Sequence, residues 1–193
     1  MGTRGSVGFV HNDIIKSFYN HFDSYPSYLG DKVLRWVQSV TLDNKLDLAA
    51  ELVDGLRDVD EGAQPTVDQL AELDTNLSRV GMTLSDSWDK RVSTGNDWYS
   101  VLRGTQGNLD RMLAAGFYSD STGFFKDSLF CEWGYVVDLD ERVLEVYKGY
   151  QEKAHSLGRF ASPESDNGYY PVALVASFPF DKLPSTLANL EEL

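Results

Sequence analysis

The stretch from residue 6 to residue 19, SVGFVHNDIIKSFY, holds two apolar runs that flank the polar residues His11, Asn12 and Asp13. Asn and Asp tolerate the left-handed backbone that a tight turn between antiparallel strands requires. The runs at 6–10 and 14–19 therefore predict the two strands of a β-hairpin.

A second hairpin is predicted close to the other end of the chain. Residues 133–139, WGYVVDL, and residues 142–150, RVLEVYKGY, have the composition of strands and flank Asp140 and Glu141, which would form the turn. Residues 170–178, YPVALVASF, add a last strand. Strand-forming sequence is thus expected at both ends of the chain.

The middle of the chain has the apolar spacing of helices. Residues 27–40 repeat apolar side chains at helical intervals, and so do residues 43–59. Thr66, followed by Gln69, is the pattern of a capping box, and it predicts that a third helix begins there.

Residues 81–128 are rich in Gly, Ser, Thr and Asp but too apolar for a free linker. Two short helices are expected within them, at 97–104 and 108–116, closed by Gly104 and Gly116. The apolar side chains of this region would otherwise lie in water, so we expect them to be packed. They include Trp88, Trp98, Tyr99, Leu102, Met112, Leu113 and Phe117.

Strands at both ends around a helical middle predict an α+β fold in a single domain, residues 1–193. One antiparallel sheet would be built from the N-terminal and C-terminal hairpins and the last strand, with helices packed on one face. Residues 43–128 would form a mostly helical insertion or lobe.

Charge and cysteine content exclude several classes of function. Thirty acidic and seventeen basic side chains give a formal net charge of -13. Such a chain repels a nucleic-acid backbone unless its few cations gather on one face, so no direct nucleic-acid binding is expected. The single Cys131 excludes an internal disulfide, and no CxxC pattern or Cys/His cluster is present. We therefore expect no metal and no cofactor.

The same features favour a cytoplasmic protein. No apolar run approaches the roughly 20 residues that a membrane helix needs, so no membrane association is expected. The start of the chain, MGTRGSVGFV, lacks the long apolar run and the cleavage site of a signal peptide. The lone cysteine fits a reducing compartment.

Candidate functional residues gather in residues 18–30, FYNHFDSYPSYLG, between the first hairpin and the first helix. A connection between a strand and a helix is a common place for a rigid scaffold to present functional side chains. The loop offers hydrogen-bond donors, acceptors and a histidine that titrates near neutral pH. The candidate binding residues are Arg4, Tyr19, Asn20, His21, Asp23, Ser24 and Tyr25.

Two interpretations of this loop stay open. In one, His21 and Asp23 serve as base and orienting carboxylate for the hydroxyl of Ser24. In the other, the loop is a structural joint in which Asp23 or Ser24 caps the helix that follows Pro26, while aromatic side chains anchor the loop on the sheet.

Four motifs resemble an uncharacterised protein family of actinobacterial phages: MGTRGSVGF, YNHFDSYPSYLG, WGYVVDLDERVLEVYKG and YYPVALVASFPFDKLP. The resemblance covers both ends of the chain and little of residues 43–128. It implies a soluble protein made in an infected or lysogenic cell, and it carries no known activity. The residues that match the central motif are Tyr19, Asn20, Asp23, Ser24, Tyr25, Pro26, Leu29 and Gly30.

These observations favour a phage-type accessory protein that binds a host protein or a small-molecule ligand, in host takeover or counter-defence. Clustered aromatic side chains suit partner recognition. The alternative is a small hydrolase or transferase that uses the 19–30 loop, with Arg4 holding an anionic group of its substrate. Whether the protein is an enzyme, and its oligomeric state, stay open at this point.

Overall fold

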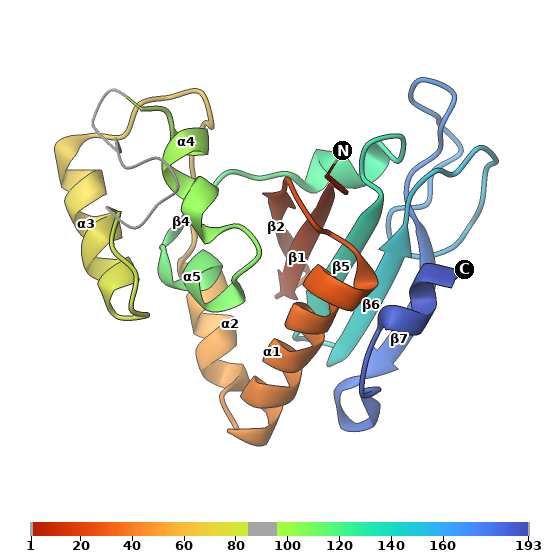
Figure 1. Cartoon of the computed structure of the whole chain (residues 1–193), viewed down its shortest axis with the longest axis horizontal. Coiled ribbons are helices and arrows are strands. Elements are labelled where there is room, and N and C mark those ends of the chain that lie inside the picture. The colour runs from red at the N-terminus through yellow and green to blue at the C-terminus, as the bar shows by residue number, and fades with distance from the viewer. Residues whose placement is uncertain (1, 85–95, 193) are drawn as a thin grey trace.

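The computed structural model describes residues 2–84 and 96–192, and a five-stranded sheet with the order β2-β1-β5-β6-β7 lies at its centre (Figure 1). The strands are β1 (Gly5–His11), β2 (Ile14–Asn20), β5 (Trp133–Asp138), β6 (Val143–Lys148) and β7 (Ala173–Pro179). Both hairpins and the last strand are confirmed, because β1 and β2, β5 and β6, and β6 and β7 pair antiparallel. The turn residues Asn12 and Asp13 have φ of 54° and 60°, as a left-handed turn requires.

The prediction of a wholly antiparallel sheet is wrong at one junction. Strands β1 and β5 run parallel, with Val7 opposite Tyr135. A tight turn forces two strands to be antiparallel, but β1 and β5 are separated by the whole middle of the chain, which is long enough for a crossover. The sheet is therefore mixed, and with helices packed on it the α+β class is confirmed.

The helical middle is confirmed, with boundaries that differ from the predicted ones. The helices are α1 (Asp31–Leu42), α2 (Leu46–Gly55), α3 (Val67–Ser78), α4 (Trp98–Leu102) and α5 (Leu109–Ala114). Shorter turns are η1 (Pro26–Gly30), η3 (Arg103–Thr105), η4 (Thr122–Lys126), η5 (Phe180–Lys182) and η6 (Ala188–Glu192). The capping box is present, since Gln69 N donates to Thr66 Oγ1 and Thr66 N donates to Gln69 Oε1.

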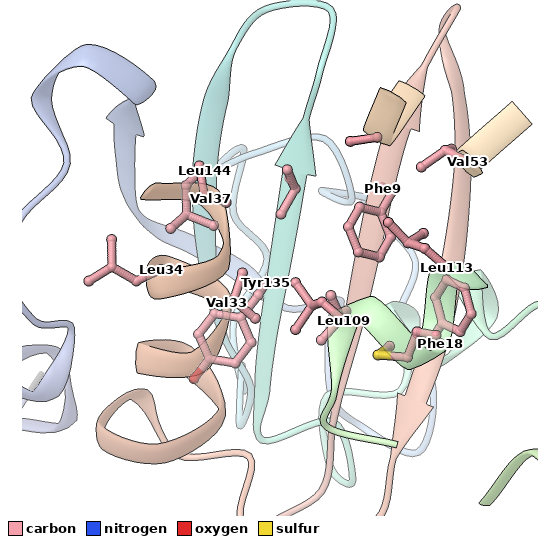
Figure 2. Packing of buried hydrophobic residues seen from close by; sticks show 14 of the residues in the cluster. Phe9, Phe18, Val33, Leu34, Val37, Val53, Leu109, Leu113, Tyr135 and Leu144 are labelled. Carbon is pink, nitrogen blue, oxygen red and sulfur yellow. The ribbon is translucent and has the colours of Figure 1, made fainter. Parts of the chain in front are cut away.

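One face of the sheet is covered by α1, α2 and α5 (Figure 2). Val33 and Val37 of α1 and Leu113 of α5 pack with the strand residues Phe9 and Tyr135 in a single buried cluster. This burial of apolar area is the main force that holds the helices on the sheet. The predicted apolar stripe of the first helix is therefore the face that α1 turns toward the strands.

The opposite face of the sheet is covered by η4 and by the segment that precedes β7. Phe125 of η4 stacks on Phe160 with ring centroids 4.1 Å apart, and both rings contact the ring of Tyr147 in β6. Every residue of β5 is consequently buried, with successive side chains directed to alternate faces. β5 is the strand around which both layers are built.

A separate hydrophobic cluster surrounds Trp98 and Phe117. It joins α3, α4 and the two-residue strand β4 (Phe117–Tyr118), which pairs in parallel with β3 (Arg57–Asp58). Figure 1 shows α3 and α4 beyond β2, to one side of the sheet. Within 43–128, α2 and α5 belong instead to the cluster on the sheet.

Two glycines in this region behave differently from each other. Gly116 follows α5 with φ of 74°, as a closing glycine should. Gly104 lies inside η3 and does not end the turn.

Trp88 lies outside the described residues. None of the helices in the described ranges is both long enough and apolar enough to cross a membrane.

Candidate functional site

The loop between β2 and α1 lies at the end of the sheet where β1 and β5 begin. We call this the loop end; it comprises residues 2–4, 20–30 and 130–132. Ser24 N donates to Thr3 O at 3.1 Å, and Glu132 N donates to Arg4 O at 3.1 Å. Backbone hydrogen bonds thus join three segments that are far apart in the sequence.

Buried polar groups fix the shape of the loop. Ser24 is completely buried, and its Oγ accepts a hydrogen bond of 2.8 Å from Asn20 Nδ2, which also donates to Phe22 O. The hydroxyl of Tyr135 donates to Ser24 O at 2.9 Å. A Cβ added at Gly5 would lie 2.7 Å from Ser24 Cβ, so only glycine allows the strand to approach this closely. The loop is therefore supported from below by the sheet.

The predicted capping role of Asp23 or Ser24 is wrong. The residue before the turn η1 is Tyr25, in an extended conformation, and its side chain makes no capping hydrogen bond. Asp23 instead turns the backbone, with φ of 53°. The turn is closed by main-chain groups, since Tyr28 N and Gly30 N both donate to Tyr25 O. The amide of Ser27 donates to Glu191 Oε1 at 2.8 Å, so this side chain from the end of the chain takes the place that Asp23 or Ser24 was predicted to fill.

A cleft of about 580 Å³ lies on one side of the loop and brings together three predicted binding residues, Arg4, Tyr19 and His21. The hydroxyl of Tyr19 lies 2.7 Å from His21 Nδ1. Burial, followed by the charges of Arg103 and Arg4, lowers the pKa of His21 below its usual 6.5. Burial raises the pKa of Tyr19. At neutral pH the pair is therefore an uncharged hydrogen-bonding group.

A second cleft, of about 540 Å³, lies on the other side of the loop and is lined by Asn20 and Asp23. Lys32 of α1 and Arg103 of η3 contribute its positive charge. Gln106 lies between the two clefts, where its Oε1 accepts a hydrogen bond of 3.2 Å from His21 N. Five of the predicted residues therefore line two different clefts, while the buried Ser24 and the exposed Tyr25 line neither.

The geometry of an activated serine is not formed by His21, Asp23 and Ser24. The hydroxyl of Ser24 is enclosed and engaged by Asn20, while His21 is paired with Tyr19. A nucleophile has to be within hydrogen-bond reach of its base and open to substrate. The structure gives no specific support to a hydrolase that uses these three residues.

Cys131 is equally unsuited to be a nucleophile. Its side chain is completely buried, and burial raises the pKa of the thiol. A buried thiol with a raised pKa is unreactive.

Exposed aromatic rings surround the loop. Phe22 is 52% exposed, Tyr25 40% and Tyr28 50%. A cation lies near a ring at three places: Lys32 Nζ is 4.1 Å from the ring of Tyr28, Arg4 Cζ 5.4 Å from that of Phe130, and Arg103 Cζ 6.0 Å from that of Phe22. Three rings of the loop end therefore each have a cation beside them.

The sequence interpretation missed residues that come from other segments. Glu61, Tyr99, Ser121 and Phe124 complete the first cleft, and Lys32, Arg103, Gln106 and Gly107 complete the second. Their local sequences contain no motif that connects them with residues 18–30.

Comparison of the chain with protein-family models, curated proteins and solved structures finds no match. Function is therefore inferred from the site itself.

Proposed function

We propose that the protein is a binding protein whose loop end engages a partner protein. The observation that carries this proposal is that Phe22, Tyr25 and Tyr28 are 52%, 40% and 50% exposed, although their loop is held by buried hydrogen bonds. Large aromatic side chains in water gain nothing for the fold, whereas they commonly supply the central contacts of a protein interface.

The order of the loop in the free protein is a second argument for a binding role. Binding is weakened when a loop must be ordered in the complex, and a loop already fixed in the free protein avoids that loss. Asn20, Ser24 and Tyr135 hold the backbone, so that the aromatic side chains project from a preformed surface. The loop residues thus divide into inner supports, such as Asn20 and Ser24, which hold the backbone, and outer contacts, such as Phe22 and Tyr25, which are exposed.

The charge around the aromatic rings indicates the chemistry of the partner. Arg4, Lys32 and Arg103 lie beside the exposed rings. A partner surface with an apolar centre and acidic groups at its rim would complement this arrangement. The resemblance to a phage family makes a protein of the bacterial host the first candidate, in host takeover or counter-defence.

Affinity capture from a lysate of an actinobacterial host tests the proposal. Three baits are compared: the parent chain, the double variant Phe22→Ser/Tyr25→Ser, and the control Leu42→Ser. Leu42 is 85% exposed and is the last residue of α1, at the helix end away from the loop, so the control removes a similar apolar group elsewhere.

The expected result is a host protein retained by the parent and by Leu42→Ser and lost with Phe22→Ser/Tyr25→Ser. Thermal melts of the three baits establish that each is folded. Retention of the same proteins by all three baits, or of none by the parent, would overturn the proposal.

A further inference from the structure

A second surface, which shares Lys32 and Arg103 with the cleft beside the loop, collects positive charge. A groove of about 640 Å³ lies between α1 and the segment from η3 to α5, and we call it the α1–α5 groove. Five cations line it, together with the indole of Trp36: Lys32, Arg35, Lys45, Arg103 and Arg111.

Five basic side chains in one groove are unexpected in a chain with a net charge of -13 and only seventeen basic residues. The carboxylate that lines the groove is Asp110, and its Oδ1 accepts a hydrogen bond of 2.9 Å from Trp36 Nε1. Cations therefore outnumber carboxylates in the groove, while the opposite holds for the whole chain.

The fold does not use most of these charges. Arg57 and Arg159, elsewhere in the molecule, are paired with Glu72 and with Asp138 and Glu145. In the groove, Lys45 pairs with Asp43 at 2.8 Å. Across residues 2–84 and 96–192, no carboxylate lies within ion-pair distance of the guanidinium groups that line the groove, those of Arg35, Arg103 and Arg111.

We infer that the α1–α5 groove binds a small molecule that carries several phosphate groups. Guanidinium groups bind phosphate oxygens in pairs through parallel N–H donors, and three of them line this one groove. The volume falls within the range of about 300–1,000 Å³ that is usual for small-molecule sites.

A small ligand fits the charge distribution better than a nucleic acid does. Outside the groove, acidic residues outnumber basic ones more strongly than in the whole chain, so a long polyanion would extend over a surface that repels it. A compact polyphosphate can instead place all of its charge among the five cations.

The groove also opens toward the loop. Lys32, Arg103, Gln106 and Gly107 line both the groove and the cleft that contains Asn20 and Asp23. Bound phosphate would therefore lie close to the loop end without needing its aromatic side chains.

Isothermal titration of the purified chain with inorganic tripolyphosphate, orthophosphate and ATP tests this inference. The groove variant is Arg35→Gln/Arg111→Gln, because neither residue lines the two clefts beside the loop. The matched control is Arg142→Gln, which removes an exposed cation from the turn between β5 and β6. The emission of Trp36, identified by comparison with Trp36→Phe, provides a second readout inside the groove.

We expect tripolyphosphate to bind the parent with a stoichiometry of one and to bind more weakly as salt is added. Affinity should fall at least about tenfold in the groove variant, because two charge-assisted hydrogen bonds are lost, and should be unchanged in Arg142→Gln and in Phe22→Ser/Tyr25→Ser. Should the double variant fail to fold, the exposed single substitution Arg35→Gln replaces it, with an expected loss of about tenfold.

Three results would overturn the inference: no binding of tripolyphosphate or ATP even at low salt, equal affinity in the groove variant and the control, or no change in Trp36 emission on binding. Displacement of tripolyphosphate by a lower concentration of a single-stranded oligonucleotide would also overturn it, in favour of a nucleic-acid site.

Discussion

Polar side chains form hydrogen bonds at both ends of the central sheet, but the two ends differ in how many of their side chains the fold itself uses. The tip end contains the turns at 12–13 and 139–142, and the loop end contains residues 20–30 with their neighbours. At the tip end the two carboxylate oxygens of Asp140 accept hydrogen bonds from Asn12 N and Asp13 N, each of 3.0 Å. The polar side chain there ties one hairpin to the other.

At the loop end the buried polar groups support the backbone and leave the aromatic side chains and cations directed outward. Asn20 and Ser24 hydrogen-bond to each other, while Phe22, Tyr25 and Tyr28 remain about half exposed. The comparison shows that a loop rich in polar and aromatic residues indicates a binding site only where some of its side chains make no contact that the fold needs.

The largest effect is expected at the tip end. Asp138 is buried, accepts hydrogen bonds from Asp140 N and Glu141 N, and receives one of 2.6 Å from Arg159. Asp138→Ala leaves these donors without a partner and should lower the free energy of unfolding by about 3 kcal/mol. Urea denaturation measures the loss, and host-protein capture should be unchanged where the variant is folded. A loss below about 1 kcal/mol would mean that this carboxylate is not a structural tie.

The next effect separates inner supports from outer contacts at the loop end. Asn20→Ala removes two hydrogen bonds of a buried side chain and should lower the free energy of unfolding by about 2 kcal/mol. Phe22→Ala, in an exposed position of the same loop, should change it by less than about 1 kcal/mol. Denaturant midpoints of the two variants beside the parent give the comparison. Equal losses of unfolding free energy in the two variants would mean that Asn20 does not support the loop more than Phe22 does.

A smaller effect distinguishes a backbone role of Asp23 from a capping role. Because Asp23 has φ of 53° and caps no helix, Asp23→Gly should be more stable than Asp23→Ala by roughly 1 kcal/mol. A capping role would instead make Asp23→Ser nearly as stable as the parent, because serine caps well, whereas a left-handed position makes Asp23→Ser as unfavourable as Asp23→Ala. Thermal melts of the three variants decide between these results.

The smallest expected effect is on how the free energy of unfolding depends on pH, which should differ between the two ends of the sheet. The pKa of His21 is lowered from 6.5, chiefly by burial, so the unfolded chain binds this proton more readily and stability falls as the pH drops below about 6.5. The pKa of Asp140 is lowered from 3.8, chiefly by the hydrogen bond from Asp13 N. Its contribution is present above pH 3.8 and is lost as the pH falls through the lower folded value.

Unfolding measured from neutral to acid pH should show both windows. His21→Gln should flatten the profile below about pH 6.5 and leave the acid window intact, and Asp140→Asn should do the reverse. A profile unaffected by His21→Gln would mean that His21 has the same proton affinity in the folded and unfolded chain.

Local features of the fold followed from the sequence alone. The Asn-Asp turn at 12–13, the capping box of Thr66 and Gln69, and the apolar stripe of α1 depend on residues a few positions apart, whose backbone preferences act wherever the segment lies. The choice of residues 18–30 as the candidate site depended in the same way on one short stretch, and its test lies in the binding experiments.

Only the tertiary structure decided how distant segments meet. The parallel pairing of β1 with β5, the burial of Ser24 beneath Tyr135, and the approach of Arg103 to the loop all join residues that no local preference connects. The same holds for the five cations of the α1–α5 groove, which are dispersed between positions 32 and 111 in the sequence. Hydrophobic burial brought these segments together, and because it is not directional, apolar spacing in the sequence did not specify which polar groups would become neighbours.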